Sequence, residues 1–117
     1  MVEDSFSAAH QLRGYEGPCE KLHGHTWKVK AIFSGKSTGK LGMVVDFKIL
    51  KNKLHEAIKE LDHGNLNELK QFKVTNPTCE NVSKLIFGKL KGEKSGGAKL
   101  SKVVVFESPT SSAAYHE

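Results

Sequence analysis

The amino-acid sequence predicts an α+β domain in which two strands, two helices and two further strands follow one another. Three observations support this order. Near the N-terminus apolar residues recur at every second position, in the middle they recur at steps of three and four, and near the C-terminus short apolar runs return. Strands grouped in pairs around helices favour a four-stranded antiparallel sheet with both helices on one face. At 117 residues, we expect one domain spanning 1–117.

The first two strands are expected over residues 2–9 and 23–34. Side chains alternate between the two faces of an extended chain, so every second residue should share an environment. In the second strand Lys28 and Lys30 define an exposed face. Its other face is apolar or histidine, and it comprises His23, His25, Trp27, Val29, Ala31 and Phe33.

Two amphipathic helices are expected in the middle of the chain. The first begins after Asp46, whose carboxylate can cap it, and ends near Leu61. The second has Pro77 in its first turn, with Asn76 or Thr78 as the cap. The buried stripes are Phe47, Leu50, Leu54, Ile58 and Leu61 in the first helix, and Val82, Leu85, Ile86 and Leu90 in the second.

The third strand is predicted over residues 103–106. This run is apolar at both parities, so we expect it to be covered on both faces. It ends at Glu107, and a short last strand follows over residues 112–116.

The amino-acid composition limits the partners and the cellular location that we expect. The net charge of +5 comes almost entirely from lysine, and a lysine-rich surface attracts anions of many kinds. Aromatic residues are not interleaved with the lysines and no nucleic-acid-binding module is recognisable, so we expect no nucleic-acid partner. The sequence has no apolar run that could span a bilayer and no N-terminal signal segment, and we expect a cytoplasmic protein without a membrane partner.

Three histidines form a candidate metal site. His23 and His25 point to the same side of a predicted strand, and His10 stands at the end of the preceding one. Three neutral imidazoles that leave a fourth position open are the ligand set of a catalytic zinc ion. The competing interpretation is that each is an ordinary, partly buried histidine.

Cys19 lies four residues before His23, and its role is open from the residues alone. It could be a fourth zinc ligand, which would close the site, or a buried inert thiol. A thiol beside bound zinc and a lysine could also ionise near neutral pH and exchange protons. A second cysteine, Cys79, makes two, too few for a disulfide framework.

Five short segments, which together span nearly the whole chain, form a recognisable set. They are Phe6-Ser7-Ala8-Ala9-His10, Cys19-x-x-x-His23-Gly24-His25, Leu61-Asp62-His63-Gly64-Asn65-Leu66-Asn67, Pro77-Thr78-Cys79-Glu80-Asn81 and Phe106-Glu107-Ser108-Pro109-Thr110-Ser111. In sequence and in order, these segments resemble those of the 6-pyruvoyltetrahydropterin synthase and 6-carboxytetrahydropterin synthase family. The resemblance implies the tunnelling fold (T-fold), in which ββααββ subunits join their sheets into an oligomeric barrel, as a trimer or a dimer of trimers, with active sites between subunits. Such joining would also pair the open edges of a four-stranded sheet.

The resemblance also implies roles for individual residues. Cys19 would be the general acid/base, and Glu20 beside it has no assigned role, although related pterin enzymes that lack the cysteine use a glutamate in this loop. Asp62 and His63 would form a dyad that exchanges protons with Cys19 of a neighbouring subunit, although the two could simply be a polar helix end. Because neighbours on a strand point apart, the dyad needs an irregular backbone, which Gly64 could provide.

Glu107 ends an apolar strand, so its charge needs a partner. That partner could be a lysine from another strand. The resemblance implies instead the amino and N3–H donors of a pterin, and it places Thr78, otherwise a helix-start residue, near the same pocket.

The activity implied by the resemblance is that of a zinc-dependent lyase. It converts 7,8-dihydroneopterin triphosphate to 6-carboxy-5,6,7,8-tetrahydropterin with release of acetaldehyde and triphosphate, a step toward 7-deazapurines and queuosine. Lys21, Lys28 and Arg13 are candidates to attract the triphosphate. One alternative is a 6-pyruvoyltetrahydropterin synthase that stops after triphosphate elimination. A different class of alternative is a zinc-binding oligomer without activity, or an RNA-binding module.

Overall fold

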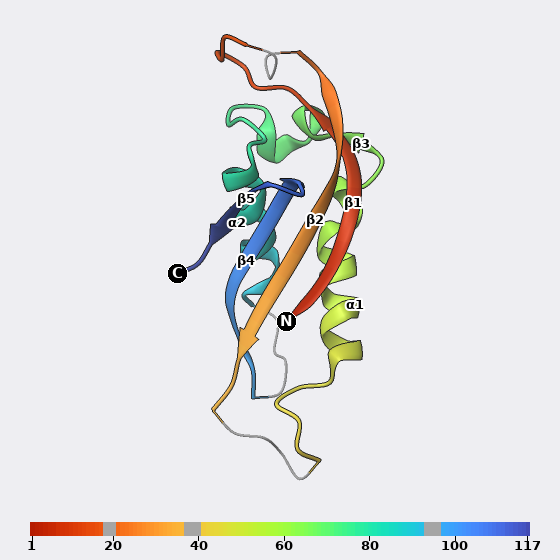
Figure 1. The fold of residues 1–117 in the computed structure, drawn as a ribbon, viewed down its shortest axis with the longest axis vertical. Coiled ribbons are helices and arrows are strands. Elements are labelled where there is room, and N and C mark those ends of the chain that lie inside the picture. The colour runs from red at the N-terminus through yellow and green to blue at the C-terminus, as the bar shows by residue number, and fades with distance from the viewer. Residues whose placement is uncertain (18–20, 37–40, 93–96) are drawn as a thin grey trace.

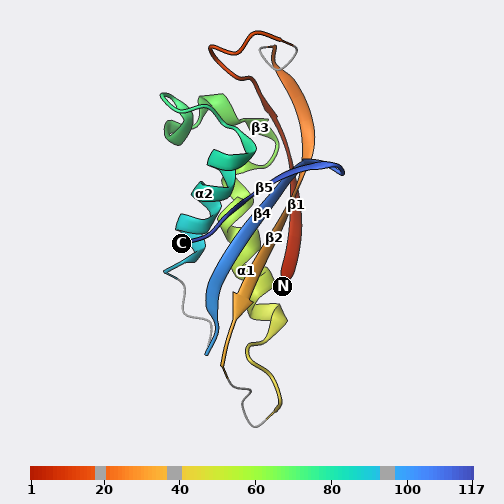
Figure 2. The same ribbon diagram turned by 60° about the vertical axis from the view of Figure 1, so that its left-hand side comes forward.

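The computed structural model describes residues 1–17, 21–36, 41–92 and 97–117. Four main strands form an antiparallel sheet in the order β1 (Val2–His10), β2 (His23–Ser34), β4 (Lys99–Ser108) and β5 (Ser111–Tyr115). Two helices, α1 (Phe47–Ile58) and α2 (Cys79–Leu90), lie on one face of this sheet, as the edge view in Figure 2 shows. The predicted α+β class and element order are therefore confirmed.

The sheet contains one strand that the sequence analysis did not expect. The two-residue strand β3 (Gly64–Asn65) pairs in parallel with Ala8 and Ala9 of β1, which makes the sheet five-stranded and mixed (Figure 1). So short a strand has no periodicity to detect, and it exists because the chain after α1 runs beside β1.

The first helix begins as predicted and ends in a tighter turn. The Asp46 side chain accepts a hydrogen bond from the backbone N–H of Lys48, which caps α1. The α-helix ends at Ile58, and a 3₁₀ turn η2 (Lys59–Leu61) carries the chain to the buried Leu61. Two further 3₁₀ turns, η3 (Leu66–Glu68) and η4 (Lys70–Phe72), lead toward α2.

Thr78, one of the two predicted caps of the second helix, is confirmed, whereas the prediction that Pro77 belongs to the first turn is wrong. Thr78 has an extended backbone, and its hydroxyl accepts from the N–H of Asn81, so Thr78 is the N-cap and α2 begins at Cys79. Pro77 therefore precedes the cap, where its carbonyl is free to accept a hydrogen bond from outside the helix.

The core lies between the helices and the inward face of the sheet. Trp27, Val29 and Ala31 of β2 are completely buried there, as the alternation predicted. Their helix-side partners include Leu50, Leu54, Ile58, Val82, Ile86 and Leu90.

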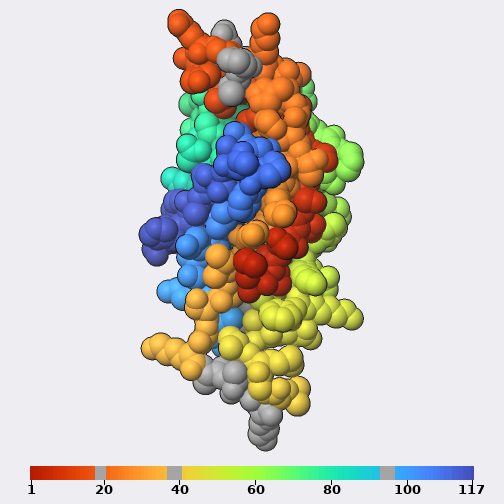
Figure 3. Space-filling view, in the orientation of Figure 1, coloured from red at the N-terminus to blue at the C-terminus, as the bar shows by residue number. Residues whose placement is uncertain are grey.

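The expectation that residues 103–106 are covered on both faces does not hold among the described residues. Val103 and Val105 are fully buried against the helices, whereas Val104 and Phe106 are only half-buried. The ammonium of Lys30 lies over the Phe106 ring, 5.2 Å from its centroid, on the sheet face opposite the helices. Figure 3 shows this face of β1, β2 and β4 without a covering helix.

Candidate active site

The pairing of β1 with β2 brings the three predicted metal ligands together. The register places His10 directly opposite His23, and His25 follows two residues later on the same face. One nitrogen from each of the three rings lies within 4.8 Å of the others. The Trp27 indole packs edge-to-face against His10 and His25, with centroid distances of 4.8 and 5.6 Å, and closes the apolar side of the cluster.

Backbone carbonyls orient two of these rings. His10 Nδ1 lies 2.7 Å from the carbonyl oxygen of Pro77, and His23 Nδ1 lies 2.7 Å from that of Lys21. A carbonyl only accepts, so each Nδ1 must carry the proton and each Nε2 keeps its lone pair. The Nε2 atoms of His10 and His25 are buried and have no hydrogen-bond partner among the described residues. Unpartnered, buried imidazole nitrogens that converge are the donor set that a divalent metal requires.

The electrostatics of the cluster favour the neutral imidazoles that a metal needs. Burial lowers the pKa of His10, a hydrogen bond to Pro77 partly opposes this, and the neighbouring His23 and His25 lower it further. The pKa of His25 is lowered for the same leading reason, burial, with a contribution from His23. The charge of Glu107 acts in the opposite direction on both rings, so Glu107 lies within electrostatic range of the cluster. Near neutral pH both rings are therefore available as ligands.

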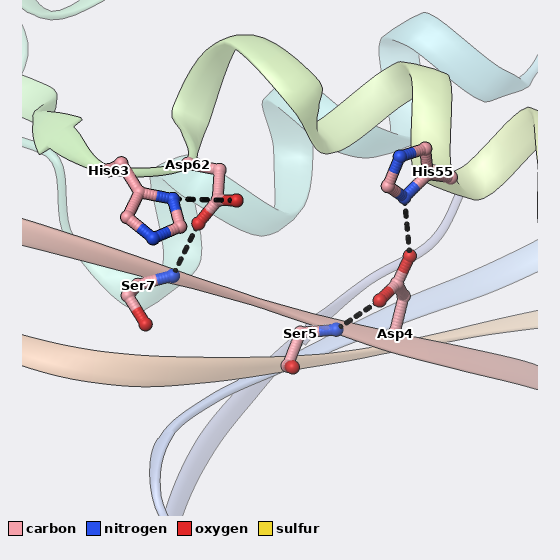
Figure 4. Close-up of polar contacts among 6 residues, drawn as sticks. All are labelled: Asp4, Ser5, Ser7, His55, Asp62 and His63. Atoms are coloured by element: carbon pink, nitrogen blue, oxygen red, sulfur yellow. Dashed lines mark hydrogen bonds and ion pairs between the residues drawn. The ribbon is translucent and has the colours of Figure 1, made fainter.

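Asp62 and His63 form a hydrogen-bonded pair at the outer edge of β1 (Figure 4). His63 Nδ1 lies 2.9 Å from Asp62 Oδ2. Asp62 Oδ1 accepts from the backbone N–H of Ser7 at 2.9 Å, and the N–H of His63 donates to the Ser7 carbonyl at 2.6 Å. The Ser7 N–H is the main reason that the pKa of Asp62 is lowered, and the bond to His63 adds to it. The carboxylate is therefore ionised and fixed in place.

The irregular backbone that this pair requires lies at His63 itself. His63 has a φ of 59°, a left-handed conformation that non-glycine residues rarely adopt. This conformation turns the imidazole back toward its neighbour Asp62. The irregular backbone was expected at Gly64 and lies at His63 instead. Strained backbone conformations of this kind are often found at functional sites.

The structure does not bring the Asp62–His63 pair into the histidine cluster. The His63 side chain is 82% exposed, whereas His10 is 2% exposed. His63 and His25 border the same open hollow of about 510 Å³, together with Ser7 and Gly24. Among the described residues the metal-ligating group contains the three histidines alone.

Glu107 approaches the cluster from β4, whereas Thr78 is the N-cap of α2. Glu107 follows Val103 and Val105 on the inward face of β4 and lines a cavity of about 760 Å³ with His25, Lys28 and Phe106. The Thr78 hydroxyl is engaged as the helix cap.

Two further predictions concern residues of the loop after β1. Cys19 and Glu20 lie outside the described residues, so their expected roles stay predictions. Arg13 was a candidate for binding triphosphate, but its guanidinium donates to the carbonyl oxygens of Phe72 and Thr75, the latter at 2.8 Å. It is directed at the protein backbone.

Cys79 is buried and differs chemically from a reactive thiol. Its Sγ donates to the carbonyl of Val105 at 3.2 Å, and burial raises its pKa to about 11. It is therefore protonated at neutral pH and unreactive.

The groups that orient the imidazoles could not be predicted from the sequence. They are the backbone carbonyls of Pro77 and Lys21, and a backbone carbonyl has no signal of its own in a sequence.

None of the helices in the described ranges is long and apolar enough to cross a membrane.

Comparison with known proteins supports the assignment of a family. The sequence model of 6-pyruvoyl tetrahydropterin synthase matches residues 1–117. A Synechocystis protein named 6-carboxy-5,6,7,8-tetrahydropterin synthase is 42% identical over 97% of this chain and 88% of its own length. A Pyrococcus furiosus protein named dihydroneopterin monophosphate aldolase is 37% identical over 88% of this chain and 83% of its own. The solved structure of Caenorhabditis elegans 6-pyruvoyl tetrahydropterin synthase superposes with a TM-score of 0.89 at 33% identity, covering 99% of this chain and 92% of that one. The chain therefore belongs to the 6-pyruvoyl tetrahydropterin synthase family.

Proposed function

We propose that this protein is a zinc-dependent lyase that converts 7,8-dihydroneopterin triphosphate to 6-carboxy-5,6,7,8-tetrahydropterin, acetaldehyde and triphosphate, a step toward queuosine and other 7-deazapurines. The observation that carries the proposal is the cluster of His10, His23 and His25, in which two buried Nε2 atoms have no partner among the described residues. The 42% identity to a relative of that name over nearly the whole chain supports the choice of reaction.

The three histidines would hold the metal, and their donor set fits zinc with a position left open for substrate. When bound, zinc would supply Lewis acidity to the oxygens of the substrate side chain. Cys19 would move a proton as general acid/base, and Asp62 would hold the His63 imidazole for the same task. Each of these groups then contributes about 10²–10⁴-fold in rate.

The pterin would be held by Glu107, with Thr78 at the border of the same pocket. A carboxylate accepts two parallel N–H donors in a bidentate arrangement, which matches the edge of a pterin ring. Lys28 lies in the same cavity as Glu107 and, with the exposed Lys21, would attract the phosphates.

A homo-oligomer would complete the active site. His63 is exposed at one edge of the sheet, and β5 forms the opposite edge (Figure 1). We propose that copies join through such edges in a trimer or a dimer of trimers, and that His63 of one chain acts together with Cys19 of another.

Product analysis is the direct test. The purified protein is incubated with 7,8-dihydroneopterin triphosphate, and products are identified by mass spectrometry together with an assay for acetaldehyde. Formation of 6-carboxytetrahydropterin and acetaldehyde is expected. A pyruvoyl product without acetaldehyde would show that the reaction stops at triphosphate elimination.

A second candidate function is aldol cleavage of dihydroneopterin monophosphate. The specific observation in its favour is the Pyrococcus furiosus relative of that name, at 37% identity. Offering the monophosphate in parallel separates the two candidates, because an aldolase would turn over the monophosphate in preference to the triphosphate. Zinc retention without turnover of either compound would favour a non-enzymatic protein.

The role of Cys19 is tested by replacing it. Cys19→Ala should abolish turnover, while the zinc content measured by mass spectrometry stays at the wild-type level. The matched control is Cys79→Ser, which keeps a donor for the Val105 carbonyl and should retain activity. Loss of zinc from Cys19→Ala would show that the thiol is a ligand, and the proton-transfer role would then be wrong.

A further inference from the structure

The outer edge of β1 and of the chain after it is closed by one continuous segment. At every second residue from Ser7 to Arg13, the outward backbone groups bond to residues 62–76. Ser7 bonds to Asp62 and His63, Ala9 pairs with Asn65, Gln11 bonds to Asn67, and Arg13 bonds to Asn76. The segment that contains His10 is therefore paired with β2 along one edge and with residues 62–76 along the other.

In the last two of these contacts, an asparagine side chain accepts from the N–H and donates to the carbonyl of the same residue. We call this arrangement a clasp. Asn67 Oδ1 accepts from the N–H of Gln11 at 2.9 Å, and its Nδ2 donates to the Gln11 carbonyl at 3.0 Å. Asn76 Oδ1 accepts from the N–H of Arg13 at 2.9 Å, and its Nδ2 donates to the Arg13 carbonyl at 2.9 Å. A side-chain amide carries both a donor and an acceptor, so it replaces the pairing that a neighbouring strand would give.

The Asn76 clasp differs from the Asn67 clasp in what it holds. The Asn76 carbonyl accepts from Asn81 Nδ2 at 2.9 Å, and the Arg13 guanidinium donates to the carbonyls of Phe72 and Thr75. The segment before Pro77 is thus tied to α2 on one side and to Arg13 on the other. The next carbonyl along the chain, that of Pro77, is the one that receives His10 Nδ1.

We propose that Asn76 and Arg13 are positioning residues for the metal site. By fixing the Pro77 carbonyl against His10 Nδ1, they hold the imidazole in the tautomer and orientation that leave Nε2 free for the metal. The consequence for metal binding rests on the proposed zinc site. Partners that orient a ligating histidine typically change metal affinity by about 10–100-fold when they are lost.

The same contacts favour this positioning role of Arg13 over the attraction of phosphate by its charge. A guanidinium that donates to two backbone carbonyls and has a planar fork of donors cannot be replaced by a lysine of equal charge. Arg13→Lys therefore separates the two roles: a residue that attracts phosphate by charge would tolerate the change, and a residue that positions Pro77 would not.

The experiment compares Asn76→Ala with Asn67→Ala, which removes an equivalent clasp without touching the segment before Pro77. Zinc affinity of the full chain is measured by competition with a chromogenic chelator, and stability is measured by denaturant unfolding. Asn76→Ala and Arg13→Lys should each weaken zinc binding about tenfold or more. Asn67→Ala should lose comparable stability but much less zinc affinity. Equal zinc affinities in Asn67→Ala and Asn76→Ala would overturn the proposal.

A second measurement uses the wild-type protein and does not depend on whether a variant folds. Long-range ¹H–¹⁵N NMR correlations of the metal-free protein report which nitrogen of His10 carries the proton. Protonation at Nδ1 is expected in the wild type and a mixture of tautomers in Asn76→Ala. Protonation of wild-type His10 at Nε2 would overturn the proposal. A wild-type protein that binds no zinc would instead refute the proposed zinc site, and the His10 tautomer would still decide the positioning role.

Discussion

Two of the histidine-containing regions of this molecule are built in opposite ways. His10, His23 and His25 converge on the helix-covered face of the sheet, beside the fully buried Trp27, and burial lowers the pKa of two of them. His63 stands at the sheet edge with 82% of its side chain exposed, held by the carboxylate of Asp62.

The difference shows that one chain forms the histidine cluster by itself, whereas the Asp62–His63 pair faces outward, toward a neighbouring copy in the proposed oligomer. The cluster is formed by the pairing of β1 with β2 and is oriented by backbone carbonyls of the same chain, so one chain can assemble it. Three hydrogen bonds fix the Asp62–His63 pair, one between the two side chains and two to the backbone of Ser7 in β1, yet the His63 imidazole faces outward. We therefore expect metal binding and proton transfer to respond independently to mutation.

The largest effect is expected from His25→Ala. Removing one of three imidazoles leaves too few ligands for tight binding, so zinc content should fall from roughly one ion per chain to almost none. Turnover should become undetectable. Metal analysis and the product assay measure both, with His116→Ala as the control, since His116 lies exposed near the end of the chain. Full zinc content in His25→Ala would remove this residue from the ligand set.

His63→Ala should lower turnover by about 10²–10⁴-fold without changing zinc content. His55→Ala provides a matched control, because His55 is also exposed and paired with an aspartate, Asp4, at 3.2 Å (Figure 4). Steady-state kinetics should show wild-type turnover for His55→Ala. If both variants lost activity equally, the effect would reflect the edge of β1 in general and not His63.

Mixing two inactive variants tests whether the two regions meet between chains. Cys19→Ala and His63→Ala are unfolded together and refolded as a mixture, then assayed for turnover. If the site is shared, some sites receive an intact Cys19 and an intact His63 from different chains, and activity should return. A mixture as inactive as its parents would place both groups in one chain.

A moderate effect is expected at the cap of α2. Thr78→Ala should lower the free energy of unfolding by about 0.5–2 kcal/mol, because the Asn81 N–H loses its acceptor. Thr78→Ser keeps a hydroxyl and should restore most of that stability in denaturant unfolding. A raised KM in Thr78→Ala that Thr78→Ser reverses would also support contact with substrate, whereas an unchanged KM would confine Thr78 to capping.

The smallest effect concerns the pH dependence of Asp62. Its pKa is lowered in the folded protein, mainly by the Ser7 N–H, so its stabilising contribution is present above the unfolded pKa near 4. That contribution is lost as the pH falls through the lower, folded pKa. Wild type should therefore lose more stability than Asp62→Asn on acidification below about pH 4. An NMR titration that placed the Asp62 pKa at or above 4 would contradict this.

Regular elements were predictable where periodicity was long. The strand expected over 23–34 is confirmed by β2, and Asp46 caps α1 as predicted. The strand β3 and the contact of the Pro77 carbonyl with His10 were not foreseen, because both depend on contacts with β1. A two-residue strand and a carbonyl acceptor carry no periodic signal in the sequence.

The sequence by itself determined the alternation that puts His23 and His25 on one face, since the period of a strand is a local property of the backbone. Only the tertiary structure decided that His10 lies opposite His23, that Pro77 and Lys21 turn the imidazoles, and that His63 adopts a left-handed backbone. These features depend on the register and on contacts between segments distant along the chain, whose geometry exists only once the sheet and its edge have formed.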